Sequence, residues 1–240
     1  MKLTDFKALT FDCYGTLIDW ETGMVEGLKP LTSRAASPLS RDEILSAHAR
    51  YESAQQAQTQ GKLYRDILAI VYKRLAEEWG VAATHDECAR YGNSVADWPA
   101  FADSAEALAY LKGHYKLIIL SNVDNASFEH SRARLGVEFD AVYTAEDIGK
   151  YKPALCCFDY LFDYLPALGI GKDDFLHVAE SLFHDHAPAN RCGIASCWLN
   201  RGHAREGFGA TMAPGKMPGY NFRFNSMADF AAAHREELKT

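Results

Sequence analysis

Short apolar runs that end in polar residues alternate with helical patterns along most of this chain. The first run, FKALTFD over residues 6–12, is rich in β-formers and ends abruptly at Asp12. The later strand-like runs cover residues 115–120, 140–144, 175–179, 195–199 and 221–225. This succession predicts an α/β fold, a doubly wound and mostly parallel sheet with helices on both faces.

In a sheet of this kind, ligands bind outside the carboxyl ends of the strands. The residues that follow the first four runs are therefore the candidates for function. They are Asp12, Ser121, the segment 145–152 and the segment 180–185. The Gly- and Pro-rich stretch 202–220 follows the fifth run, and we expect it to be a long surface loop.

Residues 19–97 differ from the rest, because no strand-like run of useful length interrupts them. Ser40 and Glu43 form a capping-box pattern ahead of apolar residues at helical spacing, and residues 63–75 form a second amphipathic pattern. We therefore predict an all-helical insert after the first strand. The predicted domains are an α/β core of residues 1–18 plus 98–240 and a helical cap of residues 19–97.

Composition narrows the class of protein. Of the 240 residues 48% are apolar and 24% charged, as in ordinary globular proteins. The net charge of −7 and the lack of a long basic run argue against a nucleic-acid partner and favour a small molecule. No apolar run reaches the roughly 18–20 residues that span a membrane. The first residues lack the apolar region of a signal peptide, so we expect a cytoplasmic protein with reduced cysteines.

The hexapeptide DCYGTL at residues 12–17 carries the strongest chemical signal. A carboxylate at a strand end, followed by a glycine turn and a hydroxyl, suits a nucleophile beside hydrogen-bond donors. An isolated aspartate in such a pattern is more often a helix cap or a turn residue. The later motifs change that balance: IILSN at 118–122, YKP at 151–153, and the acidic pair Glu180 and Asp185.

Taken in this order, the motifs resemble those of the haloacid dehalogenase (HAD) superfamily over about residues 6–200. The resemblance implies a Rossmann-like core, a helical cap and a hydrolase in which Asp12 is a covalent nucleophile. It implies that Thr16 and Ser121 hydrogen-bond the carboxylate of Asp12 or of the substrate. In the remaining implied roles Asn122 lines the substrate site, Lys152 keeps the nucleophile ionised, and Asp185 orients water or ligates a metal.

Tyr14 distinguishes between the branches of this superfamily. Its phosphatases usually carry a second aspartate at this position, which protonates the leaving group and later activates water. A tyrosine is a poor substitute, but a halide leaves as a stable anion and needs no proton. The sequence DCYGT therefore resembles the (S)-2-haloacid dehalogenases, and Tyr14 is expected at the substrate. The implied reaction is displacement of halide by Asp12, followed by hydrolysis of the aspartyl ester, with no required cofactor.

Other positions leave alternatives open. Glu180 and Asp185 are spaced like metal ligands of the phosphatases, so Asp12, Glu180 and Asp185 would hold Mg²⁺ if a metal is bound. The alternative function is then a Mg²⁺-dependent phosphatase for a small phosphomonoester. A third reading is a catalytically idle domain that binds a metabolite or a protein.

A cap arginine is expected to receive the anionic substrate, because its fork of donors matches a carboxylate. We expect this residue to be Arg50, with Arg41 and Arg65 as substitutes. His184 and His186 flank Asp185, and both are more readily explained as structural residues. The amphipathic cap also offers a surface for a homodimer.

Overall fold

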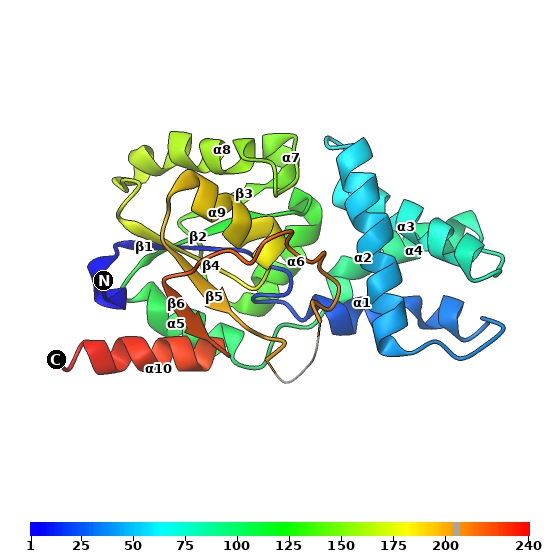
Figure 1. Ribbon diagram of the computed structural model, residues 1–240, viewed down its shortest axis with the longest axis horizontal. Helices are drawn as coiled ribbons and strands as arrows, with labels where there is room; N and C mark the ends of the chain where they lie inside the picture. The colour runs from blue at the N-terminus through cyan, green and yellow to red at the C-terminus, as the bar shows by residue number, and fades with distance from the viewer. Residues whose placement is uncertain (204–206) are drawn as a thin grey trace.

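The computed structural model describes residues 1–203 and 207–240 and contains one six-stranded parallel sheet in the order β3-β2-β1-β4-β5-β6 (Figure 1). The strands are β1 (Ala8–Phe11), β2 (Lys116–Ser121), β3 (Ala141–Thr144), β4 (Phe175–Ala179), β5 (Ser196–Leu199) and β6 (Phe222–Phe224). Each overlaps a run that the sequence predicts as a strand. The predicted doubly wound α/β fold is therefore confirmed.

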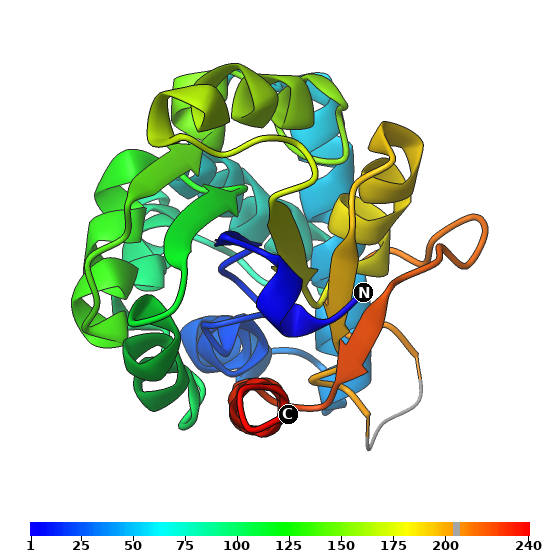
Figure 2. The ribbon, with the colours of Figure 1, turned by 90° about the vertical axis from the view of Figure 1, so that its left-hand side faces the viewer.

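Alternate residues of the central strands face two separate hydrophobic clusters, as the period of a β-strand requires. Leu9 and Phe11 of β1 belong to one cluster with residues of α5 (Ser104–Lys112), α6 (Asn125–Leu135) and α10 (Met227–Glu237). Ala8 belongs to the other, with residues of α8 (Cys156–Tyr164) and α9 (Ala187–Cys192). Seen along the strands, helices lie on both sides of the sheet (Figure 2).

The segment predicted as a helical cap contains helices and no strand of the sheet. Its elements are α1 (Trp20–Thr32), α2 (Arg41–Gln58), α3 (Tyr64–Glu78), α4 (His85–Gly92) and the 3-10 helix η2 (Asn93–Asp97). The capping box of Ser40 and Glu43 is formed at the start of α2. In Figure 1 these helices lie beyond the carboxyl ends of the strands, where a ligand of the sheet would bind.

The two segments that join cap and core run side by side. Ile18 and Ala100 form an antiparallel bridge, and the backbone N–H of Asp19 donates to Pro99 O at 2.8 Å. On the other side of the bridge, the N–H of Phe101 donates to Leu17 O at 3.1 Å. The insert therefore leaves and re-enters the core at one narrow neck.

Four short helices complete the described core: η1 (Leu3–Asp5), α7 (Ala145–Ile148), η3 (Leu165–Leu168) and the π-helix η4 (Leu182–His186). Of these, α7 follows β3 and η4 follows β4. No described helix is long and apolar enough to cross a membrane. All six cysteines carry free thiols, as the sequence predicts.

The stretch 202–220 is more than the surface loop expected from its composition, although residues 204–206 lie outside the described part. Ala210 and Thr211 are buried, and the N–H of Ala210 donates to Glu21 Oε1 at 3.0 Å. Glycine and proline predict an irregular backbone, but they do not indicate what that backbone packs against. In this structure the backbone at Ala210 packs against α1, the first helix of the cap.

Candidate active site

Asp12 follows β1 directly, at the carboxyl edge of the sheet, and only 6% of its surface is exposed. Its backbone N–H still pairs with Val178 O of β4, so the strand ladder fixes where the side chain starts. Thr16 Oγ1 donates to Asp12 Oδ2 at 2.7 Å, and Lys152 Nζ donates to Asp12 Oδ1 at 3.0 Å. Both carboxylate oxygens are therefore held by residues that the sequence singled out.

Lys152 is 2% exposed and lies between two carboxylates. Besides Asp12, its ammonium donates to Asp185 Oδ1 at 2.6 Å and to Leu120 O at 2.8 Å. Asn122 holds the lysine backbone from both sides: Lys152 N donates to Asn122 Oδ1 at 2.7 Å, and Asn122 Nδ2 donates to Lys152 O at 3.0 Å. Asn122, expected to line the substrate site, lines the small pocket beside Asp12 while its amide positions Lys152.

Asp185 lies in the π-helix η4 after β4 and is fully buried. His177 Nε2 is 2.9 Å from the same oxygen, Oδ1, that binds Lys152. The other oxygen, Oδ2, is buried and has no hydrogen-bond partner among the described residues. A buried carboxylate oxygen without a donor is costly, so this atom is a candidate for contact with water or substrate.

The shared ammonium acts differently on the pKa of each carboxyl. Burial raises the pKa of Asp12, and the charge of Lys152 only partly offsets that effect. Burial also favours a raised pKa of Asp185, but Lys152 and the hydrogen bond from His177 bring it below its usual range. Burial lowers the pKa of Lys152, but Asp12 and Asp185 outweigh it and raise that pKa above its usual value. Asp185 is thus the carboxylate that stays ionised beside the Lys152 ammonium, and Asp12 is the more basic and more reactive carboxylate.

A small pocket of about 30 Å³ opens beside Asp12, with room for about one water molecule. Core and cap both line it: Asp12, Tyr14, Trp20, Glu52, Gln56, Tyr64, Ser121, Asn122, Lys152, Ser181, His184, Asp185 and Thr211. The Ser121 hydroxyl is buried without a partner among the described residues, and it is therefore available to donate to a ligand.

The cap supplies no arginine to this pocket, contrary to expectation. Arg50 lies on the exposed side of α2, where its Nη2 donates to both oxygens of Glu78 at 2.8 and 3.0 Å. Of the two substitutes, Arg41 pairs with Glu21 and Arg65 with Asp124, and neither lines the pocket. Among the described lining residues, Lys152 is the only lysine or arginine.

Tyr14, expected at the substrate, lines the small pocket, but its hydroxyl already has a hydrogen-bond partner. The hydroxyl oxygen is 2.9 Å from Ser131 Oγ of α6, and the ring packs edge-on against Trp98. Burial raises the pKa of Tyr14 well above its usual value. Tyr14 therefore contributes an apolar wall, whereas an aspartate at this place would contribute a proton donor.

The residues proposed for Mg²⁺ do not form a fitting site. Lys152 Nζ occupies the place between Asp12 and Asp185 that a cation would need. Glu180, the third expected ligand, lines a neighbouring cavity instead. One unpartnered oxygen, Asp185 Oδ2, suits a water molecule, whereas Mg²⁺ takes six ligands in an octahedron. No cluster of three or more His, Cys, Asp or Glu side chains among the described residues has metal-binding geometry.

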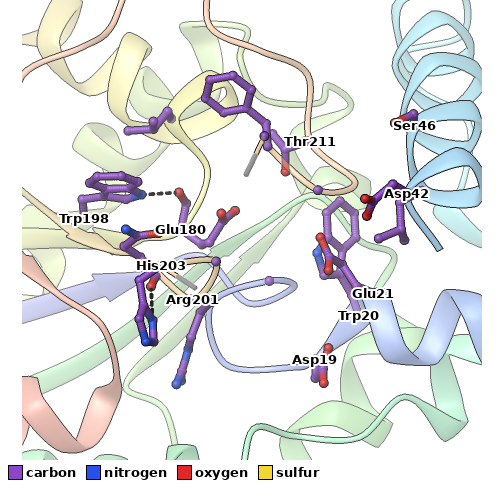
Figure 3. A pocket seen from close by; sticks show the side chains of 18 of the residues that line it. Asp19, Trp20, Glu21, Asp42, Ser46, Glu180, Trp198, Arg201, His203 and Thr211 are labelled. Carbon is purple, nitrogen blue, oxygen red and sulfur yellow. Dashed lines mark hydrogen bonds between the residues drawn. The ribbon is translucent and has the colours of Figure 1, made fainter. Parts of the chain in front are cut away.

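The neighbouring cavity has a volume of about 380 Å³ and lies between core and cap (Figure 3). Trp198 and Glu180 approach it from the core, and Asp42 and Ser46 from α2. Trp20 and Thr211 line both this cavity and the small pocket, so they separate the two spaces. We call it the outer cavity.

Sequence reasoning missed several residues that the tertiary structure brings to the site: His177, Glu52, Gln56, Tyr64 and Thr211. Only His177 had a signal, as a polar residue within the otherwise apolar run FLHVA. His186, read as structural, is buried and bonds to Ser196 and to Ala179 O. His184 lines the pocket, with its ring nitrogen Nδ1 3.2 Å from Ser181 Oγ.

Comparison with known proteins agrees with this geometry. The family of haloacid dehalogenase-like hydrolases matches residues 6–185. YfnB of Bacillus subtilis (strain 168), named as a HAD-hydrolase, is 24% identical over 200 residues, which cover 81% of this chain and 84% of YfnB.

Two solved structures share the fold. The L-2-haloacid dehalogenase from Xanthobacter autotrophicus with chloropropionic acid covalently bound superimposes with a TM-score of 0.77 and 18% identity, covering 96% of this chain and 98% of that one. YfnB bound to magnesium gives a TM-score of 0.74 and 18% identity, covering 96% and 99%. Because the family matches residues 6–185, three quarters of its length, the chain belongs to the haloacid dehalogenase-like hydrolases.

Proposed function

We propose that the chain hydrolyses the carbon–halogen bond of a small 2-haloalkanoic acid through an aspartyl ester on Asp12. The observation that carries this proposal is the residue two positions after Asp12. It is Tyr14, and its hydroxyl is hydrogen-bonded to Ser131. A phosphate ester needs an acid to protonate its alkoxide, and no second carboxyl is present at this place. A halide departs with its electron pair and needs no proton.

In the first step an oxygen of Asp12 attacks the α-carbon of the substrate. A carbon–oxygen bond forms, the carbon–halogen bond breaks, and halide leaves from the opposite face, which inverts the carbon centre. Lys152 and Thr16 hold the carboxylate oriented, and the raised pKa of Asp12 makes it a stronger nucleophile while it is ionised. Buried next to the nucleophile, the free hydroxyl of Ser121 would donate to the substrate carboxylate.

In the second step water attacks Cγ of the Asp12 ester. One proton of this water passes to Asp185 Oδ2, the oxygen that has no hydrogen-bond donor among the described residues. When the tetrahedral adduct collapses, the bond between Cγ and the alkyl oxygen breaks, and the alkoxide takes the proton from Asp185. The products are a 2-hydroxy acid and a free Asp12, which releases one proton to solvent as it ionises.

The relatives agree in part with this scheme. The Xanthobacter autotrophicus enzyme, named as an L-2-haloacid dehalogenase, carries chloropropionic acid covalently. YfnB, named as a HAD-hydrolase, is bound to magnesium, as the metal-dependent alternative would require of this chain. The Lys152 bridge and the outlying Glu180 favour the former for this chain.

The test is halide release from (S)-2-chloropropionate in the presence of a chelator, with mass spectrometry of the tryptic peptide that contains Asp12. We expect turnover in wild type, a transient adduct on that peptide, and loss of turnover by about 10³-fold or more in Asp12→Asn. Asp5→Asn, at an exposed position of η1, is the matched control and should keep wild-type activity.

Chelator-sensitive phosphate release from phosphomonoesters without halide release would favour the phosphatase instead. Ligand-induced thermal shifts without either activity would favour the idle domain.

A further inference from the structure

His177 lies in the middle of β4, a strand in which all five residues are buried. A fully buried imidazole is unfavourable unless both ring nitrogens find partners. Both do: Nδ1 is 2.9 Å from Thr10 Oγ1, and Nε2 is 2.9 Å from Asp185 Oδ1. Thr10 is the residue of β1 that pairs with His177 in the sheet register, so the ladder itself aligns this contact.

The direction of these hydrogen bonds follows from the acceptor. An ionised carboxylate only accepts hydrogen bonds, so Nε2 of His177 must carry the hydrogen that points to Asp185. Nδ1, the other ring nitrogen, lies 2.9 Å from the Thr10 hydroxyl, which can act as donor or acceptor. The contacts of His177 with Thr10 and Asp185 therefore fix the orientation of the ring and keep Nε2–H directed at Asp185.

The two donors to Asp185 reach the same oxygen. Lys152 Nζ lies 2.6 Å and His177 Nε2 2.9 Å from Oδ1, while Oδ2 has no partner among the described residues. With Lys152 as its only donor, this carboxylate could rotate and offer either oxygen, or both, to the ammonium. The second donor, which comes from the sheet, removes that freedom.

We infer that His177 is a positioning residue for hydrolysis of the aspartyl ester: it fixes Oδ1 of Asp185, so that Oδ2 stays free for the attacking water. This inference rests on the proposed function, because the water attacks an ester of Asp12. His177 itself is not among the described residues that line the pocket. Its effect is confined to the second step, since displacement of halide requires Asp12 and Lys152 but no proton acceptor.

The decisive variant is His177→Leu, which keeps an apolar strand residue and removes the donor. We expect its kcat to fall by about 10- to 100-fold, as for a misplaced acid–base group. Halide release in the first turnover should stay within about threefold of wild type. The ester should accumulate on Asp12, and KM should fall with kcat, which leaves kcat/KM unchanged.

Three further variants separate positioning from a general loss of packing. His177→Gln retains an N–H donor of similar reach and should recover most of the kcat. Thr10→Val removes the hydroxyl that orients the ring and should give an intermediate loss. His234→Leu is the matched control, because His234 is also buried and bonded, to Tyr110, but lies in α10 away from the site. It should lose stability and keep wild-type kinetics.

An equal fall of the first-turnover rate and of kcat in His177→Leu, or an unchanged kcat, would overturn the inference. A crystal structure of the same variant provides a readout independent of activity. We expect the Asp185 carboxylate to rotate and present both oxygens to Lys152. If the carboxylate did not move, the positioning role would be refuted, whether or not wild type releases halide. If wild type released no halide, the proposed function alone would be refuted.

Discussion

Asp12 and Asp185 share one ammonium, but the protein treats them differently. Asp185 receives a second donor from His177 and is the stable half of the pair. Asp12 is held by Thr16 and Lys152 in a site where burial still dominates, so its ionised form is unfavourable. Functional carboxylates are often kept in such unfavourable surroundings, because the reaction relieves them.

This difference predicts that Asp12→Asn stabilises the fold. The folded pKa of Asp12 is raised, so its ionised form destabilises the protein at pH 7, and this penalty disappears as pH falls below the unfolded pKa near 3.8. The melting temperature of Asp12→Asn should exceed that of wild type by about 2 °C or more at pH 7, at ~1.4 kcal/mol per pKa unit. The gap should close towards pH 4.

Asp185→Asn is the control with the opposite sign. The pKa of Asp185 is lowered, so its ionised form stabilises the protein at pH 7, and the contribution is lost only as pH falls through that low folded pKa. We expect this variant to melt below wild type at pH 7. Equal shifts of the two variants in a pH series of thermal scans would contradict the assignment.

Glu52 faces the pocket from the cap, where the expected arginine is absent. It is 5% exposed and accepts a hydrogen bond from Gln56 Nε2 at 3.2 Å. We expect Glu52→Gln to raise kcat/KM for a 2-haloacid by about fivefold or more, because one unit charge across 4 Å of water is worth ~1 kcal/mol. Glutamine keeps the shape and the contact with Gln56.

Steady-state kinetics with a 2-haloacid and with its neutral amide would check this prediction. Only the acid should show a higher kcat/KM in Glu52→Gln. Glu77→Gln, at an exposed position of α3, is the matched control and should change neither substrate. A loss of activity with both substrates in Glu52→Gln would show instead that Glu52 participates directly in the reaction.

At the scale of elements, the turn between β1 and α1 positions Thr16 against Asp12. Gly15 has a φ of 93°, in the left-handed region that favours glycine, and its N–H donates to Ile18 O at 2.8 Å. This turn brings Thr16 Oγ1 back to Asp12. The same oxygen, Thr16 Oγ1, also accepts a hydrogen bond from the N–H of Glu180 at 2.9 Å. One tight turn thus ties β1 to the segment after β4.

Gly15→Ala should therefore cost both stability and activity. A Cβ would strain the backbone by about 1–2 kcal/mol and lie 3.0 Å from Trp20 Nε1. We expect a lower melting temperature and a drop in kcat/KM of about 10-fold or more, since small misplacements at a reacting group are costly. Thermal scans and halide assays measure the two effects.

Gly80→Ala is the matched control for the backbone effect. Gly80 has a φ of 66° beyond the end of α3, and a Cβ there meets nothing within 4 Å. A similar loss of stability without any kinetic change is expected. If both variants kept wild-type kinetics, the turn would not be what places Thr16.

At the scale of the molecule, cap and core each build part of one small pocket. Asp12, Lys152 and Asp185 come from the core, and Glu52 and Gln56 from the cap. A space of about 30 Å³ holds about one water, so a three-carbon acid binds only if cap and core shift. The cap could shift about the narrow neck at Ile18 and Ala100, and the outer cavity beside Trp20 offers space for that movement.

The net charge of −7 affects the whole encounter with an anionic substrate. Like charges repel, and salt screens that repulsion over a Debye length of about 8–10 Å at physiological ionic strength. For a 2-haloacid, kcat/KM should rise about twofold between 10 and 150 mM of a non-halide salt. The neutral amide should show no rise, and a fall for the acid would indicate local attraction by Lys152 instead.

The sequence by itself determined the order of strands and helices, the helical insert, and the positions of Asp12, Lys152 and Asp185. The elements and the place of Asp12 follow from local patterns: a period of two or 3.6 residues, capping residues, and polar groups at the ends of apolar runs. The same patterns placed only the segments 145–152 and 180–185 at the sheet edge, and the resemblance to the HAD superfamily singled out Lys152 and Asp185 within them. The sheet then brings those ends together, because parallel strands share one carboxyl edge.

Only the tertiary structure decided which side chains of the cap meet that edge. Arg50 and Glu52 are two residues apart on α2, so at 3.6 residues per turn they point to nearly opposite sides of the helix. Packing turned Glu52 into the pocket that Asp12 also lines and left Arg50 with Glu78. The same holds for His177: its strand predicted burial, but its bonds to Thr10 and Asp185 depend on the register of β1 with β4 and on the path of η4. Local periodicity cannot encode either partner.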